Sequence, residues 1–121
     1  MTIKKILVVD DSPTERLAMT ELLSARGYQV VTAENGEDAI AKSKSEKPDL
    51  ILMDVVMPGM NGYQATRTIS RDDATRSIPI IMCTSKGLET DRIWGMRQGA
   101  FDYLVKPVDP AELLTRIQAL G

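Results

Sequence analysis

Three short runs of aliphatic residues stand out along the chain, at Ile6–Val9, Leu50–Met53 and Ile80–Cys83. A strand that is covered on both faces of a sheet shows such an unbroken apolar run, whereas a strand with one face in water alternates apolar and polar residues. Two further segments, Tyr28–Ala33 and Ala100–Val105, mix the two kinds of residue. The pattern therefore predicts three central parallel strands flanked by two edge strands.

The segments between these strands have helical spacing and helix start signals. Ser12–Glu15 and Asp109–Glu112 each place a capping residue, a proline and a glutamate in the order typical of a helix N-terminus. Weaker signals mark the three middle helices. The expected helices run from Pro13 to Gly27, from Asn35 to about Glu46, from Asn61 to about Ser70, from Leu88 to Gln98 and from Pro110 to Leu120.

The strict alternation of five strands with five helices predicts the fold class. Parallel strands joined by right-handed helical crossovers form an α/β fold with a doubly wound sheet, and five strands suit the flavodoxin-like order 2-1-3-4-5. The length of 121 residues is typical of one domain. We therefore expect a single domain over residues 1–121, without a second catalytic or output domain.

Composition removes several functional classes. The chain has no histidine, which excludes His-based catalysis and histidine metal sites, and its single cysteine, Cys83, allows no internal disulfide or cysteine–zinc cluster. A net charge of −2 gives no general attraction to nucleic acids. The N-terminal apolar run is too short for a signal peptide or a membrane span. We therefore expect a cytoplasmic protein that binds neither nucleic acid directly nor a membrane.

Residues able to carry chemistry follow the apolar runs directly. Asp10 and Asp11 come after the first predicted strand, Asp54 after the third, Thr84 at the end of the fourth and Lys106 after the fifth. The carboxyl ends of the strands in a doubly wound sheet meet at one edge, where ligands bind. Carboxylates brought together there repel one another, and a site made of oxygen ligands suits Mg²⁺. The sequence therefore predicts Mg²⁺ at this edge.

A carboxylate beside Mg²⁺, a lysine and a hydroxyl is suited to phosphoryl transfer, with the carboxylate as nucleophile. Asp54 is the natural candidate because it ends a central run and precedes the turn Met57–Gly59. The sequence contains no glycine-rich phosphate-binding motif, and Asp54-Val55-Val56 lacks the second aspartate of aspartate-nucleophile phosphatases. An enzyme that acts on external substrates is therefore disfavoured.

This set of motifs resembles the receiver domains of two-component response regulators over essentially the whole chain. The shared motifs are Asp10-Asp11, Asp54 with Met57-Pro58-Gly59 and Gly62, Thr84-Ser85, and Lys106-Pro107. The resemblance implies that Asp54 accepts a phosphoryl group from a CheA-like histidine kinase. It also implies that Asp11, Asp54 and the backbone carbonyl of Val56 bind Mg²⁺, while Asp10 acts through a metal-bound water.

Further roles follow from the same resemblance. Thr84 and Lys106 would contact the phosphoryl oxygens, and Tyr103 would be the aromatic residue whose rotamer switches on activation together with Thr84. The peptide between Lys106 and Pro107 would be cis. The target protein would bind the face formed by the last two helices and the fifth strand. Such a protein catalyses only its own phosphorylation and dephosphorylation.

Shorter stretches resemble a narrower group, the PilH-type single-domain regulators of twitching motility. They are Pro13–Glu15, Gln64–Arg67, Trp94–Gly95 and Arg97–Ala100. A chemotaxis-like regulator stays open at this point, as do a phosphate sink for a partner regulator and a phosphorylation-independent interaction module. The apolar Val56 offers no hydrogen bond to an attacking water, which predicts slow self-dephosphorylation.

Overall fold

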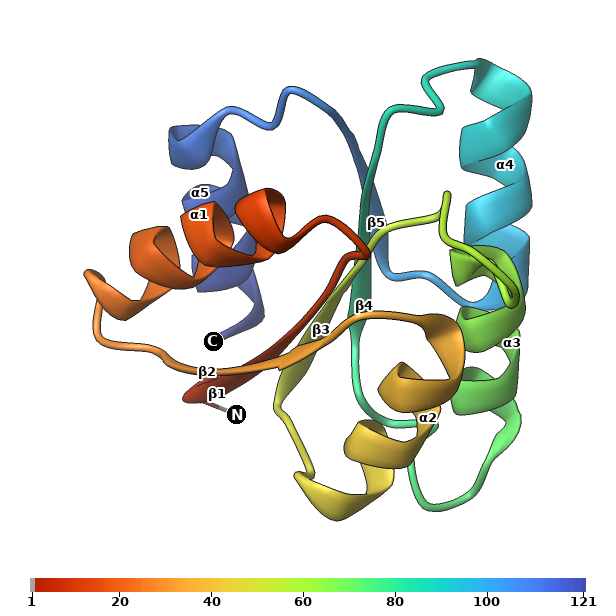
Figure 1. The fold of residues 1–121 in the computed structure, drawn as a ribbon, viewed down its shortest axis with the longest axis horizontal. Coiled ribbons are helices and arrows are strands. Elements are labelled where there is room, and N and C mark those ends of the chain that lie inside the picture. Colours follow the sequence, from red (N-terminus) through yellow and green to blue (C-terminus); the bar gives the residue numbers. More distant parts are fainter. Residues whose placement is uncertain (1) are drawn as a thin grey trace.

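The computed structural model describes residues 2–121 and contains a five-stranded parallel sheet in the order β2-β1-β3-β4-β5 (Figure 1). The strands are β1 (Lys5–Val9), β2 (Gln29–Ala33), β3 (Leu50–Met53), β4 (Ile80–Thr84) and β5 (Asp102–Val105). They alternate with the helices α1 (Pro13–Ser24), α2 (Gly36–Ser45), α3 (Gly62–Arg71), α4 (Glu89–Gln98) and α5 (Pro110–Leu120). The flavodoxin-like fold class predicted from the alternation is confirmed.

The central strands are buried on both faces, as their apolar runs predict. Every residue of β3 and β4 is buried. In β1, Ile6 pairs with Val30 of β2 on one side and with Leu50 of β3 on the other. β2 and β5 form the two edges of the sheet and keep partly exposed residues. The mixed polar and apolar pattern of these two segments therefore identified the edge strands correctly.

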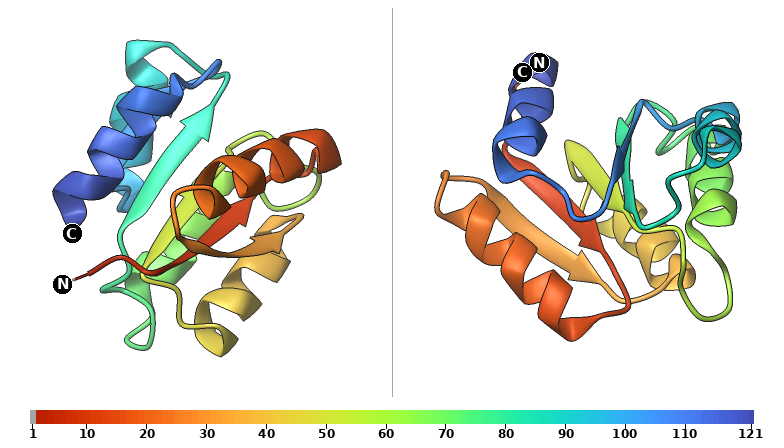
Figure 2. Two further views of the ribbon diagram at one scale, coloured as in Figure 1. Left: turned by 90° about the vertical axis from the view of Figure 1, so that its left-hand side faces the viewer. Right: turned by 90° about the horizontal axis from the view of Figure 1, so that it is seen from above.

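The helices form two layers around the sheet (Figures 1 and 2). α1 and α5 cover one face, where Leu23 and Leu113 belong to the core around Leu52. α2, α3 and α4 cover the other face, where Ala39 and Ile69 belong to a second core. Each fully buried Leu or Ile stabilises the fold by about 1.5–3 kcal/mol, so these two cores fix the sheet from both sides. None of the helices within residues 2–121 is long and apolar enough to cross a membrane.

Local signals fix most helix ends. Four helices begin with a side chain that accepts a backbone N–H of the first turn, from Ser12, Asn35, Asn61 and Asp109. α4 ends at Gly99, whose φ of 113° is left-handed. The helical residues of α1 end at Ser24, and Gly27, with a left-handed φ of 90°, closes the helix C-terminus as expected. The N–H of Gly27 donates to the Ser24 carbonyl and that of Tyr28 to the Leu23 carbonyl, the pair of bonds by which such a glycine ends a helix.

Candidate functional site

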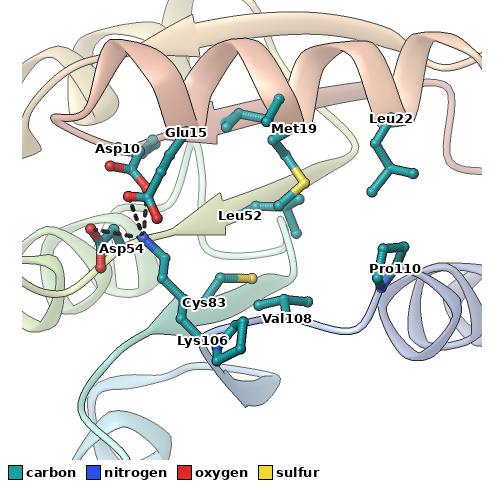
Figure 3. A pocket seen from close by; sticks show the side chains of 14 residues that line it. Asp10, Glu15, Met19, Leu22, Leu52, Asp54, Cys83, Lys106, Val108 and Pro110 are labelled. Carbon is teal, nitrogen blue, oxygen red and sulfur yellow. Dashed lines mark hydrogen bonds and ion pairs between the residues drawn. The ribbon is translucent and has the colours of Figure 1, made fainter.

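The carboxyl ends of β1, β3 and β5 lead into the segments that carry Asp10, Asp54 and Lys106 (Figure 3). The Lys106 Nζ lies 2.8 Å from Asp10 Oδ2 and 3.4 Å from Asp54 Oδ2. Both aspartates are buried, with exposed fractions of 6% and 7%. The structure therefore brings together three of the residues that the sequence singles out, although 96 positions separate Asp10 from Lys106.

A fourth charged side chain, Glu15, belongs to this group and was missed by the sequence analysis. Its Oε2 lies 2.9 Å from Lys106 Nζ. Ser12 Oγ accepts the Glu15 N–H at 3.3 Å, as expected of a helix cap. In a full capping box the Glu15 carboxylate would accept the Ser12 N–H in return. Here the Ser12 N–H donates to Asp10 Oδ1 at 2.9 Å instead. Glu15 lies in the first turn of a helix that starts just beyond β1, but its spacing from Ser12 is that of an ordinary helix cap, so the sequence carries no separate signal for its place in the site.

The three carboxylates are arranged in a way that suits a divalent cation. One oxygen from each of Asp10, Glu15 and Asp54 lies within 4.8 Å of the others, and the Lys106 ammonium is the positive charge among them. Oxygen donors without nitrogen or sulfur ligands fit a hard ion such as Mg²⁺. Asp11 is exposed and stands outside this group of three, so its direct contact with the ion stays a prediction.

The burial and charges of the site shift two pKa values. Burial raises the pKa of Asp54 above its ordinary value, Lys106 partly offsets this effect, and the charge of Asp10 raises the pKa again. Burial lowers the pKa of Lys106, but its hydrogen bonds to Asp10 and Glu15 and the charge of Asp54 outweigh burial, so the pKa is raised. The lysine is therefore charged, and a second cation would relieve the remaining repulsion among the carboxylates.

The loop from β3 to α3 holds Asp54 at the edge of the sheet. Asp54 Oδ1 accepts the N–H of Val55 at 2.8 Å. A Cβ on Gly62 would overlap the carbonyl oxygen of Asp54, so only glycine lets the start of α3 approach this closely. Two residues after Asp54, Val56 is 57% exposed, so this position of the loop presents an apolar side chain to water.

Thr84 and Tyr103 are joined through the backbone of Lys86. Thr84 is fully buried at the end of β4, and its Oγ1 accepts the Lys86 N–H at 3.3 Å. The Tyr103 hydroxyl donates to the Lys86 carbonyl at 2.6 Å and lies 3.4 Å from the hydroxyl of Tyr63. Burial, and then Tyr63, raise the pKa of Tyr103, so this hydroxyl keeps its proton. One residue of the loop after β4 therefore contacts both expected switch residues.

A pocket of about 370 Å³ opens beside the charged group, between α1 and the segment from β5 to α5 (Figure 3). Apolar side chains line most of it, including Met19, Leu22 and Val108. Cys83 also lines the pocket, and burial raises its pKa to about 12, which makes it the inert thiol expected of a buried cysteine. The peptide between Lys106 and Pro107 is cis, as the resemblance implied.

The fold and the site define a small α/β signalling module whose acidic, lysine-containing site lies at the carboxyl edge of the sheet. Residues 6–118 match the family described as response regulator receiver domain, and the chain belongs to this family. Receiver domains are signalling modules and not enzymes that act on external substrates.

Individual proteins show how close the likeness is. Protein PilH of Pseudomonas aeruginosa is 55% identical over 116 residues, which cover 96% of each chain. The chemotaxis protein CheY4 of Vibrio cholerae has a TM-score of 0.91 at 33% identity and covers 99% of this chain and 100% of its own. The receiver domain of the sensor histidine kinase PA1611 of P. aeruginosa, which has a magnesium ion coordinated in its active site cleft, has a TM-score of 0.89 at 34% identity, with 98% of each chain covered. The chain spans about half the length of the transcriptional regulators among its curated relatives.

Proposed function

We propose that this protein is a stand-alone, single-domain response regulator of the cytoplasm that accepts a phosphoryl group on Asp54 from a histidine kinase. The observation that carries the proposal is the position of the Asp54 carboxylate, which is buried at the edge of the sheet, 3.4 Å from the Lys106 ammonium and beside Asp10. Membership of the receiver family supports a histidine kinase as donor. The likeness to PilH and CheY4 supports a CheA-like kinase and a role in twitching motility or chemotaxis-like signalling.

Mg²⁺ completes the site in this proposal. Asp11, Asp54 and the backbone carbonyl of Val56 would hold the ion directly, and Asp10 would act through a metal-bound water. The ion neutralises charge between the carboxylate nucleophile and the incoming phosphoryl group. The carboxylates of Asp10 and Asp54 and the magnesium ion in the PA1611 receiver domain support Mg²⁺ at this edge of the sheet, while the contact of Asp11 rests on the resemblance to receiver domains.

The transfer itself is a single displacement at phosphorus. An oxygen of Asp54 forms a bond to phosphorus as the P–N bond of the kinase phosphohistidine breaks, and the departing imidazole nitrogen keeps the electron pair. Lys106 and Thr84 then donate hydrogen bonds to the phosphoryl oxygens, where negative charge collects. Lys106 already faces Asp54, and the Thr84 hydroxyl, which accepts the Lys86 N–H, keeps its own O–H as the donor for a phosphoryl oxygen.

The contacts of Thr84 connect the site to a binding face. Because the backbone of Lys86 contacts both the Thr84 and the Tyr103 hydroxyls, a change at Thr84 also releases Tyr103. The target protein then binds the α4-β5-α5 face. The exposed apolar side chains of α4, its N-cap and β5 are Leu88, Ile93, Trp94, Met96 and Val105. This exposed apolar surface favours a switch that binds a partner over a phosphate sink.

Incubation with acetyl phosphate and Mg²⁺, followed by intact-mass measurement, tests the proposal. We expect the mass to increase by one phosphoryl group, and we expect no increase with EDTA or in Asp54→Asn. Asp49→Asn is a matched control because Asp49 lies at the opposite end of the sheet, before β3, and should be phosphorylated like the parent protein. A mass increase that persists in Asp54→Asn would contradict the assignment of the acceptor.

A further inference from the structure

Lys106 has a third acidic partner that the proposed function does not use. Its Nζ lies 2.9 Å from Glu15 Oε2, closer than the 3.4 Å to Asp54 Oδ2. Asp10 and Asp54 each accept a backbone N–H as well, from Ser12 and Val55. The Glu15 carboxylate has Lys106 as its hydrogen-bond partner and no backbone donor within the described residues.

We infer that Glu15 is a positioning residue that holds Lys106 in the unphosphorylated protein and competes with the phosphoryl group for its ammonium. The inference rests on the proposed phosphorylation of Asp54. The phosphorylated side chain carries a charge of about −1.5 to −2 in place of the −1 of the Asp54 carboxylate. It needs the lysine as a donor, yet the lysine is bound to a glutamate on α1. The carboxylate of Glu15 also repels the new charge, so both effects oppose phosphorylation.

The surroundings of the pair allow this exchange of partners. The Glu15 side chain is 50% exposed, so water can solvate its carboxylate once the lysine leaves. Both residues line the same pocket of about 370 Å³, which leaves free space next to the lysine (Figure 3). A pair that is half-exposed contributes little to stability, so it can be exchanged for a phosphoryl contact without loss of the fold.

A beryllium fluoride titration measures the competition without any turnover, because the adduct mimics a phosphoryl group on Asp54. We would follow the bound adduct by ¹⁹F NMR at saturating Mg²⁺, with the Mg²⁺ affinity of each variant measured separately by calorimetry. Glu15→Gln should bind the adduct about 1.5-fold to fivefold more tightly than the parent protein, a size typical of one partly screened charge pair. Glu21→Gln is the matched control, since Glu21 is exposed on the same helix.

Three readouts separate this electrostatic role from a structural one. The gain in Glu15→Gln should shrink as salt is raised from about 0.05 M to 0.5 M, since screening shortens the range of the charge. Glu15→Asp keeps the charge and should bind the adduct more nearly like the parent protein. In Glu15→Gln the ¹⁵N signal of the Lys106 ammonium should shift in the metal-free protein.

The outcomes are distinct for the two proposals. An affinity in Glu15→Gln that is equal to or weaker than that of the parent protein overturns the role of Glu15, while the proposed function stands. An equal gain in Glu21→Gln, or a gain that is insensitive to salt, also overturns it. If the parent protein does not bind beryllium fluoride with Mg²⁺, the proposed function fails and the role of Glu15 fails with it.

Discussion

At the scale of single residues, the site is a problem of charge balance. Asp10, Glu15 and Asp54 surround one ammonium, from Lys106, at distances between 2.8 and 3.4 Å. If all three carboxylates are ionised, two negative charges remain uncompensated in a partly buried place. Like charges that are kept from water repel strongly. Lys106 therefore compensates one of the three negative charges, and a bound cation would compensate the other two.

Replacement of Lys106 by methionine should show how much the fold depends on this ammonium. We expect Lys106→Met in EDTA to lose about 1–3 kcal/mol of unfolding free energy, because removal of one partner leaves partly buried carboxylates unpaired. Mg²⁺ should raise the melting temperature of the variant more than that of the parent protein. Lys44→Met, which breaks a surface pair with Asp72, should cost less than about 1 kcal/mol. Equal losses in the two variants, measured by urea denaturation, would contradict this account.

The raised pKa of Asp54 predicts a pH-dependent stability in metal-free buffer. Burial is its main cause, so the folded state binds the proton more tightly than the unfolded chain. The stability from this group is full below the unfolded pKa near 3.8 and is lost as pH rises through the raised folded pKa. Asp54→Asn should therefore gain about 1 kcal/mol at pH 7.

Urea denaturation in EDTA at a series of pH values checks this prediction. The extra unfolding free energy of Asp54→Asn over the parent protein should decrease as pH falls from 7 toward 4. Asp73→Asn serves as the control for loss of one negative charge, because its side chain is 94% exposed. If the difference in unfolding free energy between Asp54→Asn and the parent protein stays constant with pH, the pKa of Asp54 is ruled out as its cause.

Val56 bears on the lifetime of the phosphoryl group. Its exposed apolar side chain gives no hydrogen bond to a water that attacks in line, whereas an amide would. Val56→Asn should therefore lose its phosphoryl group about threefold to tenfold faster, as followed by intact mass after removal of the phosphodonor. Val105→Asn, on the exposed part of β5, should decay at the parent rate. Equal decay in Val56→Asn would refute the role of this side chain.

Most residues of the site could be predicted from the sequence, and Glu15 could not, for a physical reason. Asp10 and Asp54 each come directly after an apolar run, and the end of such a run marks the end of a buried strand. Glu15 stands three residues after Ser12, a spacing that the helix cap explains completely at the local level. Its actual partner lies 91 residues away, so only the fold reveals it.

At the scale of elements, α4 lies close to β5 because it has a glycine at the contact. A Cβ on Gly95 would lie 2.8 Å from Met82 Sδ and 3.0 Å from the Tyr103 ring. Tyr103 is thus enclosed between its strand and this helix, while its hydroxyl donates to Lys86. The position of α4 and the orientation of Tyr103 therefore depend on each other.

Gly95→Ala tests this dependence by setting two effects against each other. Alanine favours a helix interior over glycine by about 1 kcal/mol, but overpacking of a filled core costs about 1–3 kcal/mol. We expect a net loss of about 1 kcal/mol in urea denaturation and a change in the ring resonances of Tyr103. Arg92→Gly, at an exposed position of the same helix, measures the cost of a glycine in this helix without the Tyr103 contact. A stabilised Gly95→Ala with an unchanged Tyr103 would show that the contact is loose.

The order of the elements was predictable from the sequence, whereas some of their ends were not. Unbroken apolar runs identify the central strands because both faces must be covered. The stop of α1 at Gly27 was predictable, because this glycine has the left-handed φ of 90° that ends many helices. The start of β5 was not predictable: Ala100 was expected in the strand, but its N–H bonds to the Gly95 carbonyl of α4, and β5 begins at Asp102.

At the scale of the whole molecule, the acidic site and the exposed apolar face of α4 are separate surfaces joined by a few contacts. Thr84 ends β4 beside the site, Lys86 follows it, and Tyr103 packs under α4. A ligand can shift a conformational equilibrium only by its difference in affinity for the two states. The contacts through Lys86 are the part of the structure that could make phosphoryl binding depend on the position of α4.

Trp94, the single tryptophan, reports on this coupling because it is 49% exposed on α4. If the site and the face are coupled, saturating beryllium fluoride with Mg²⁺ should change the emission of Trp94 and its quenching by acrylamide. Thr84→Ala removes the hydroxyl that contacts Lys86, so at saturation it should bind the adduct and leave Trp94 unchanged. Because coupling is reciprocal, a partner that binds the face should tighten adduct binding by the same factor in the parent protein. An identical Trp94 response in Thr84→Ala would mean that the signal reaches α4 by another route.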